Sequence, residues 1–251
     1  MTPIAPPQGA QAALRAIRLL KLFTIERPEQ TLGELARAAG LNKTTTHRLL
    51  RALQSEALVQ KNPASGAYCL GAGLMALGVQ ALASNDLRRR VRPVLKQLAR
   101  DTGESATLEI PFEDSMLILD EVAGPHVLGA AGNVGTRWPL HATSTGKIIL
   151  AYDADQLANL PASLPRLAAK TRAEKTRLEP ELAQVRRRGY AETVDELEDG
   201  FSAVAAPLFG TVGDFQAALS IGGPTRRLDT ARRAELGVTL RHAAEALGAD
   251  L

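Results

Sequence analysis

The chain has 251 residues, of which 45% are hydrophobic and 23% are charged, a composition that indicates folded globular structure and excludes a disordered chain. No apolar run approaches the roughly 20 residues of a membrane-spanning helix, and a single cysteine, Cys69, excludes an intramolecular disulfide. The net charge of +3 identifies no partner, but residues 1–70 hold 9 Lys and Arg against 4 Asp and Glu, whereas residues 71–251 hold 21 against 23. Positive charge gathered at one end indicates a nucleic-acid-binding module.

The first residues lack the basic start and apolar run of a signal peptide. We therefore expect a flexible arm over residues 1–9 and a cytoplasmic protein that contacts no membrane. The segment from Ala10 to Phe23 has apolar side chains at helical spacing, which predicts an amphipathic helix. Its apolar stripe comprises Leu14, Ile17, Leu20 and Phe23.

The segment from Thr31 to Leu53 predicts two short helices joined by a tight turn. Gly40 stands where a positive φ ends the first helix, and Asn42 is a good N-cap for the second. The apolar stripe of the first helix comprises Leu32, Leu35, Ala36 and Ala39. The side chains that the second helix should bury are Thr46, Leu49, Leu50 and Leu53.

The opposite face of the second helix is basic and rich in short hydrogen-bonding side chains, with no carboxylate before Glu56. Such a face suits the major groove of DNA, where Arg and Lys meet phosphates and guanine while Thr or His reads base edges. A solvated basic face is the alternative. The candidate DNA-binding residues, with Arg15 and Lys43 as phosphate contacts, are Arg15, Lys43, Thr44, Thr45, His47, Arg48 and Arg51.

Two strand-like runs, Leu58–Gln60 and Tyr68–Leu70, follow and flank the turn-forming sequence Asn62–Gly66. Three helices followed by a two-stranded hairpin predict a winged helix-turn-helix over residues 10–71. The next residues, 72–86, predict a linker helix without any charge up to Ser84. Such a helix is buried against a second copy of the chain or against its own chain, and the sequence leaves both open.

Residues 87–251 predict an α+β domain, a mostly antiparallel sheet of five or six strands with packed helices. A capped helix, Leu87–Asp101, comes first, and a solvated or salt-bridged face explains its arginine run better than DNA contact. The expected strands are Ala106–Ile110, Met116–Val122, Val127–Ala131, Gly189–Thr193, Phe201–Pro207 and Phe215–Ile221. The other expected helices are Thr143–Tyr152, Glu174–Arg188 and Thr225–Leu247.

Two constellations in this half invite a chemical interpretation. Ser144 to Lys147 fits the Ser-x-x-Lys pattern of a serine hydrolase, but neither of the companion motifs occurs downstream. We prefer a helix N-terminus at which Ser144 and Thr145 seat a ligand carboxylate. The acidic run Asp195–Gly200 could hold a metal, but the four histidines are scattered, and a solvated turn is favoured. We predict no catalytic residue, no metal and no cofactor.

Five motifs occur in order along the chain, namely Thr31–Leu53, Tyr68–Gly71, Pro139–Lys147, Gly189–Ala191 and Ser220–Pro224. Together they resemble the successive signatures of the IclR family of bacterial transcriptional regulators. The resemblance implies an N-terminal winged helix-turn-helix, a linker helix that dimerises, and a C-terminal GAF-like domain that binds a small organic acid effector. It also implies homodimers, or dimers of dimers, on double-stranded operator DNA, and it favours a second copy as the partner of the linker helix.

The family's effector pocket, carried over position by position, is expected at a set of residues from the helix after Pro139 and from three strands. They are Leu128, Trp138, Ser144, Thr145, Thr193, Phe201, Ala203, Ser220 and Gly222. An acidic residue that is expected near Thr193 is absent, a frequent Cys is Ala203, and a frequent Ser is Gly222. These changes remove polarity or bulk and indicate a larger, partly apolar effector such as an aromatic carboxylate.

Overall fold

The computed structural model of the chain describes residues 9–125, 133–249 and 251. It divides into two compact units, Met1–Ser84 and Asn85–Leu251, called here the winged unit and the sheet unit. Most of the expected arm, the expected strand Val127–Ala131 and the candidate residue Leu128 lie outside the described residues. In the part of the chain that is described, no helix is long and apolar enough to cross a membrane.

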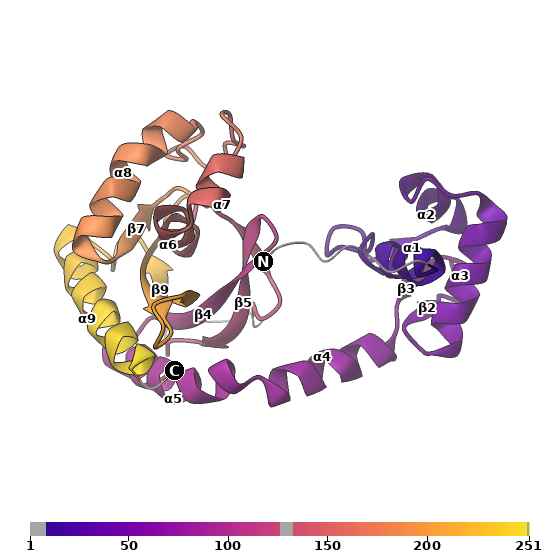
Figure 1. Cartoon of the computed structure of the whole chain (residues 1–251), viewed down its shortest axis with the longest axis horizontal. Coiled ribbons are helices and arrows are strands. Elements are labelled where there is room, and N and C mark those ends of the chain that lie inside the picture. The colour runs from indigo at the N-terminus through magenta and orange to yellow at the C-terminus, as the bar shows by residue number, and fades with distance from the viewer. Residues whose placement is uncertain (1–8, 126–132, 250) are drawn as a thin grey trace. The chain divides into compact units, whose positions relative to one another are not determined.

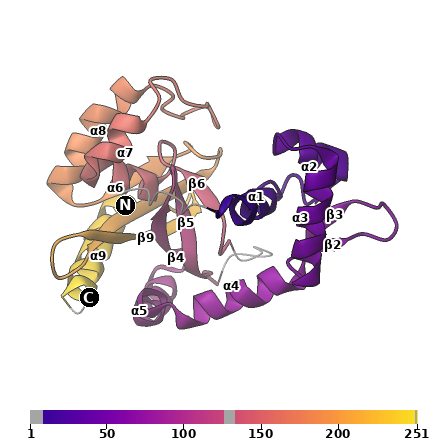
Figure 2. The same cartoon turned by 45° about the vertical axis from the view of Figure 1, so that its right-hand side comes forward.

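The winged unit packs three helices against a small antiparallel sheet, as the sequence predicts, and ends in the linker helix described below (Figures 1 and 2). Its helices are α1 (Gln11–Leu20), α2 (Leu32–Ala38) and α3 (Lys43–Ser55). Its strands are β1 (Glu29–Gln30), β2 (Val59–Lys61) and β3 (Tyr68–Leu70), in the order β1-β3-β2. The two-residue strand β1 is too short to show a sequence pattern and was not predicted.

The turn between α2 and α3 follows from local chemistry. Gly40 has a φ of +64°, a conformation that costs glycine nothing, and it ends α2. Asn42 Oδ1 accepts a hydrogen bond from the Thr45 amide at 2.8 Å and so caps α3. At the start of α2, Thr31 and Glu34 form a capping box, which fixes the other end of this helix.

The core of the winged unit joins all three helices to the sheet, and its fully packed members are Leu19, Phe23, Leu35, Leu50, Leu53, Val59 and Tyr68. The prediction for α1 was wrong at Ile17, whose side chain is 51% exposed, while Leu19 is completely buried. Two residues along a helix differ by about 200° in direction. Because Leu19 and Phe23 face the core, Ile17 must face away from it.

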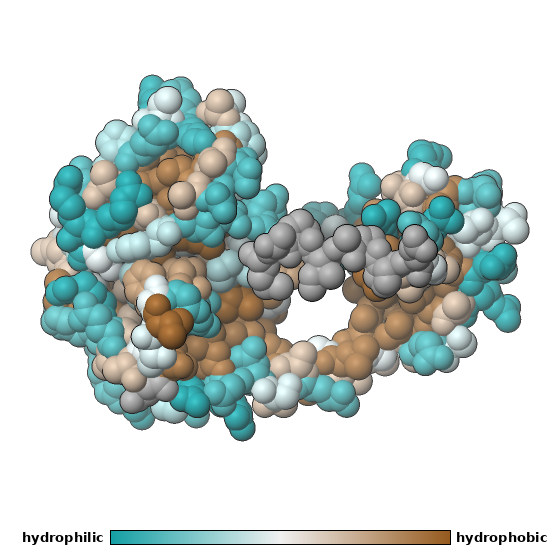
Figure 3. All heavy atoms as spheres, in the orientation of Figure 1, coloured by the Kyte–Doolittle hydropathy of each residue, from teal (hydrophilic) through white to brown (hydrophobic). Residues whose placement is uncertain are grey.

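The linker helix α4 (Ala72–Ser84) has no buried residue. Met75, Leu77 and Val79 are 68%, 55% and 66% exposed, so apolar side chains lie in solvent on a helix that carries no charge. Figure 3 shows hydrophobic residues along part of this helix. Burial of α4 against its own chain, one of the two alternatives from the sequence, is therefore not observed.

The sheet unit is built on six antiparallel strands in the order β6-β5-β4-β9-β8-β7, which confirms the predicted α+β class. The strands are β4 (Ser105–Phe112), β5 (Ser115–Val122), β6 (Arg137–Pro139), β7 (Ala191–Val194), β8 (Phe201–Phe209) and β9 (Phe215–Pro224). The helices are α5 (Asp86–Thr102), α6 (Ser144–Tyr152), α7 (Ala154–Asn159), α8 (Lys175–Arg188) and α9 (Thr230–Gly248). Strand β6 and helix α7 were not predicted.

Helices cover both faces of this sheet. Helix α6 lies against β8 and β9 with α8 packed on its outer side, and α5 and α9 cover the opposite face (Figure 1). Side chains of a strand alternate between faces, so Ala205 and Ala218 belong to the core beneath α6. Small side chains at these two positions let α6 approach the sheet closely.

The arginine run of α5 is salt-bridged, as the sequence favoured. Arg88 and Arg92 both reach the buried carboxylate of Asp120 on β5, at 3.3 and 2.5 Å. Arg89 and Arg90 pair with Asp86 in the first turn of the same helix. These contacts fix α5 to the sheet and account for the run without DNA.

Candidate functional sites

The candidate DNA-binding face is an exposed surface of α3. Lys43, Thr44, His47, Arg48 and Arg51 are exposed, and Thr45, whose amide donates to the Asn42 cap, is half-buried. On the opposite side of α3, the Thr46 side chain is fully buried and donates to the Asn42 carbonyl oxygen at 3.0 Å. Helix α3 is thus held by its inner face, which leaves the basic face open.

The charges of this face are uncompensated. Arg15 is exposed on α1, and within residues 9–125 and 133–249 no carboxylate forms an ion pair with Arg15, Lys43, Arg48 or Arg51. Cations without protein partners retain their full attraction for phosphate.

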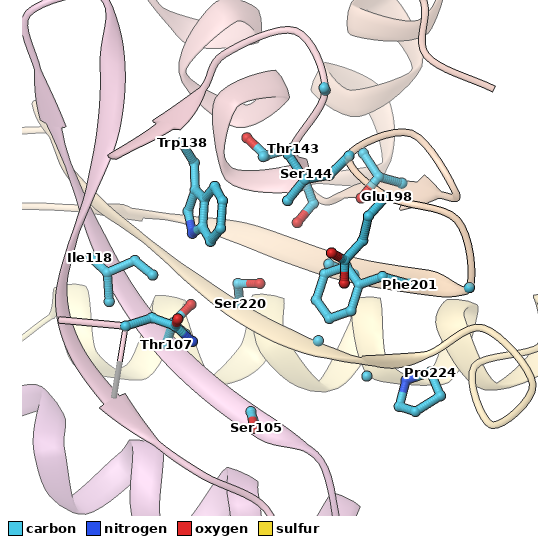
Figure 4. Close-up of a pocket in the computed structure, with 18 of the residues that line it drawn as sticks. Ser105, Thr107, Ile118, Trp138, Thr143, Ser144, Glu198, Phe201, Ser220 and Pro224 are labelled. Atoms are coloured by element: carbon cyan, nitrogen blue, oxygen red, sulfur yellow. The ribbon is translucent and has the colours of Figure 1, made fainter. Parts of the chain in front are cut away.

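The sheet unit encloses a cavity of about 600 Å³ between the sheet and the N-terminal end of α6 (Figure 4). The floor of the cavity is a row of four residues that lie side by side on neighbouring strands. They are Ser105 on β4, Gly222 on β9, Ala203 on β8 and Thr193 on β7. The neighbouring pair, Thr107 and Ser220, extends the floor along β4 and β9. Strand register therefore explains why residues far apart in the sequence line one cavity.

The cavity walls combine aromatic and polar groups. Trp138 on β6 and Phe201 on β8 lie on opposite sides, with Ser220 between them in the view of Figure 4. The segment Ala142–Ser144 borders the cavity where α6 begins, and Leu197–Gly200 closes it between β7 and β8. Thr143 caps α6 by accepting a hydrogen bond from the Gly146 amide at 3.1 Å.

The structure brings together seven of the nine predicted pocket residues, namely Trp138, Ser144, Thr193, Phe201, Ala203, Ser220 and Gly222. Leu128 lies outside the described residues. Thr145 does not line the cavity, contrary to prediction. Its hydroxyl donates to Glu109 Oε2 at 2.7 Å, because the residue after Ser144 on a helix is turned by about 100° and faces the sheet.

Gly222 and Phe201 form a matched pair. A Cβ atom on Gly222 would lie only 2.6 Å from Cζ of the Phe201 ring. The space that a side chain at 222 would occupy is thus filled by the chain's own aromatic ring, and the glycine does not enlarge the cavity as we had inferred from the sequence. The glycine instead makes room for the Phe201 ring in the cavity wall.

Four charged residues line the cavity that the sequence did not indicate, namely Glu121, Glu198, Asp199 and Arg227. Arg227 is held by the buried Glu104, with Nε–Oε1 at 2.5 Å and Nη2–Oε2 at 2.6 Å, and this hydrogen bonding raises the pKa of Arg227. Arg227 was expected in the final helix, but β9 runs to Pro224 and α9 begins only at Thr230. No motif marked it.

The acidic run Asp195–Gly200 is the solvated turn that we predicted only over Glu198–Gly200, which are exposed. Glu196 is buried, and both of its carboxylate oxygens accept hydrogen bonds from Lys147 Nζ, at 2.6 and 2.8 Å. Lys147 is completely buried and also donates to Glu181 Oε1 at 2.8 Å. Asp195 has a φ of +53° and accepts hydrogen bonds from Lys170 and Thr225, which hold its pKa at about 2.

This network removes support for hydrolase chemistry at Ser144. In a Ser-x-x-Lys hydrolase the lysine must activate the serine, but Lys147 Nζ is committed to the carboxylates of Glu181 and Glu196. In the described part of the chain, no group of three His, Cys, Asp or Glu side chains is placed to hold a metal ion. Within the acidic run, Asp195 and Glu196 serve a structural role.

Glu109 lies buried under α6, next to the cavity. It accepts hydrogen bonds from Thr145 at 2.7 Å and from Thr107, a cavity residue, at 2.9 Å. Burial raises its pKa to about 7, although the two hydroxyl groups oppose this shift.

Comparison with known proteins covers both units. The family described as "Bacterial transcriptional regulator IclR C-terminal" matches residues 79–249, and the "IclR helix-turn-helix domain" matches residues 12–63. The chain is 35% identical over 247 residues to the glycerol operon regulatory protein of Streptomyces griseus, with 97% of each protein covered.

Two solved structures share the fold. An IclR transcriptional regulator from Alicyclobacillus acidocaldarius matches with a TM-score of 0.80 at 29% identity, covering 95% of this chain and 98% of the other. An IclR homologue from Microbacterium hydrocarbonoxydans, complexed with 4-hydroxybenzoate, matches with a TM-score of 0.76 at 25% identity, covering 96% and 98%. With a helix-turn-helix at one end and a sheet domain with a ligand-sized cavity at the other, the chain belongs to the IclR family of bacterial transcriptional regulators.

Proposed function

We propose that the chain is a ligand-responsive regulator whose affinity for operator DNA changes when a small carboxylate binds in the cavity beneath α6. An aromatic carboxylate fits the lining best. The observation that carries this proposal is the cavity itself. Its volume of about 600 Å³ lies in the range of small-molecule sites, and polar and aromatic groups converge on it.

The start of α6 is the proposed seat of the carboxylate. Ser144 lines the cavity at the positive end of the α6 dipole, which favours an anion there, although Thr143 already accepts from the Gly146 amide. Trp138 and Phe201 flank the remaining space and favour a flat ring between them. The bound 4-hydroxybenzoate of the Microbacterium hydrocarbonoxydans homologue is a ligand of this type.

Titration calorimetry with the purified protein tests this assignment. An aromatic monocarboxylate should bind about 30-fold more tightly than a short aliphatic acid, because burying a ring adds about 2 kcal/mol. The Trp138→Ala variant should lose most of this preference, since its aromatic wall is gone. Tighter binding of short aliphatic acids to the unaltered protein would contradict the proposal.

The exposed face of α3 is the proposed DNA-reading surface, with His47 and Arg48 as base-reading residues and with Arg15 and Lys43 at phosphates. Arg48→Ala should cost about 1–3 kcal/mol on the operator and much less on random DNA. Lys43→Ala should weaken binding to both DNAs alike. It should also reduce the slope of the logarithm of the binding constant against the logarithm of salt concentration by about one, because one phosphate contact is lost.

Fluorescence anisotropy on operator and random duplexes at several salt concentrations measures both effects. Arg100→Ala is the control, since it removes one exposed positive charge from α5 in the sheet unit. Its binding should equal that of the unaltered protein. Equal losses on both duplexes for Arg48→Ala would contradict its base-reading role.

We further propose that α4 pairs with α4 of a second copy, giving a homodimer that can form a dimer of dimers. Exposed Met75, Leu77 and Val79 on an uncharged helix support this proposal. Effector binding would then shift the population of sheet-unit arrangements, and the paired linkers would change how two winged units fit two operator half-sites.

A further inference from the structure

Glu198 lines the cavity with a carboxylate that has no protein partner in the described part of the chain. It follows Leu197 in the turn between β7 and β8, and Figure 4 shows its side chain directed into the cavity beside the Phe201 ring. Within the described ranges, no hydrogen bond or ion pair joins the carboxylate of Glu198 to another residue. Its oxygens are therefore available to whatever enters.

The other charged groups of the cavity are already occupied. Arg227 is held by both oxygens of Glu104. Glu121 accepts hydrogen bonds from the backbone amide and the side-chain amide of Asn133, at 2.7 and 3.1 Å. Asp199 Oδ1 accepts a hydrogen bond from the Ala169 amide at 3.4 Å. The described cavity thus offers a ligand one carboxylate without a protein partner, and one arginine whose charge is already shared with Glu104.

This arrangement has a consequence for a carboxylate ligand. One end of the ligand is attracted by the start of α6, but the rest faces a side-chain lining with three carboxylates and one arginine. A second negative group on the ligand would be repelled. A hydroxyl or ammonium group would instead donate to Glu198, and a hydrogen bond to a charged acceptor is stronger than one between neutral groups.

We infer that Glu198 is a specificity residue, and that the effector is a monocarboxylic acid bearing a hydroxyl or ammonium donor that Glu198 accepts. This inference rests on the proposed function, because it assumes that the cavity takes a carboxylate at α6. It adds a second recognition point, which selects for a donor and against a second acid group.

The test compares four probes in titration calorimetry at neutral pH, namely benzoate, hydroxybenzoate, (aminomethyl)benzoate and the dicarboxylate of benzene. The substituted acids are used as their 3- and 4-isomers, so that the donor can reach Glu198 from either ring position. The hydroxyl and ammonium probes separate the two sources of the donor. The protein is the full chain, with the variants Glu198→Gln and Asp199→Asn. Asp199→Asn is the matched control, because Asp199 lines the same turn but already has an amide partner.

In the unaltered protein, an isomer of the hydroxyl or the ammonium acid should bind at least about tenfold more tightly than benzoate, and the dicarboxylate should bind most weakly. Glu198→Gln should abolish most of the donor preference and strengthen dicarboxylate binding, while Asp199→Asn should leave both unchanged. Thermal unfolding confirms that each variant is folded.

Two results would overturn the inference in distinguishable ways. If benzoate binds but neither donor improves its affinity, or if Glu198→Gln leaves the ratios unchanged, Glu198 selects nothing and the proposed carboxylate site stands. If no acid binds to any of the three proteins while uncharged aromatic probes do, the carboxylate seat at α6 is wrong, and the inference fails together with the proposed function.

Discussion

Replacing Lys147 by methionine is expected to destabilise the sheet unit by about 3–5 kcal/mol, because it leaves two carboxylates without their cation. Lys147 Nζ is completely buried and holds Glu196 and Glu181 at 2.6 to 2.8 Å. Arg172, which reaches Glu181 at 2.7 Å, is 44% exposed and compensates only part of this charge. Urea unfolding followed by circular dichroism measures the loss.

Lys170→Met is the matched control for this experiment. Lys170 also pairs with an acid of the same turn, Asp195, at 2.7 Å, but its side chain is 62% exposed. An exposed pair contributes about 1 kcal/mol or less. Adding Glu196→Gln to Lys147→Met should restore part of the lost stability, since the double variant no longer buries the Glu196 carboxylate without its cation. Equal losses for the two lysine variants would show that burial of the network adds nothing.

Replacing Glu109 by glutamine is expected to stabilise the protein at pH 8 by about 3 kcal/mol and to have little effect at pH 4.5. In the folded state the pKa of Glu109 is raised to about 7, mainly by burial, from an ordinary value of 4.5. Below pH 4.5 both states hold the proton, so the group makes no difference. Between pH 4.5 and 7 only the unfolded state releases it, and stability falls as the pH rises. Above pH 7 the loss is complete.

The glutamine variant removes this dependence while an amide oxygen remains to accept from Thr145 or Thr107. The measured quantity is the difference in free energy of unfolding between variant and parent at several pH values. Glu179→Gln, on the exposed surface of α8, should differ from the parent by only a few tenths of a kcal/mol throughout. A Glu109→Gln difference that does not change with pH would contradict the raised pKa.

The sequence was sufficient for elements whose pattern is local. Helix α3 was predicted from its apolar spacing and from Asn42, and the structure shows this cap and the buried Leu50 and Leu53. The strands β4 and β5 were likewise predicted, as Ala106–Ile110 and Met116–Val122, and they pair directly with each other. Strand β6 was missed because its three residues, one of them Pro139, form a strand only by pairing with β5.

The cavity was predictable in part, for a physical reason that the two neighbours Ser144 and Thr145 illustrate. Resemblance to the family indicated which segments meet, and strand register then placed most of the candidates on one face. It did not indicate the direction of each side chain around α6, so Thr145 was misplaced. Nor did it reveal that Lys147 would reach Glu196, because the two are 49 residues apart.

The first turn of α6 has a consequence for anyone who wishes to retarget this regulator as a biosensor. Within four residues, Ser144 faces the cavity, Thr145 is tied to β4 through Glu109, and Lys147 is tied to α8 and the acidic turn. A mutational library that includes this turn would mostly return unfolded proteins. Diversity is better placed at Trp138 and Thr193, where the cavity can change its shape while the framework that supports it is left intact.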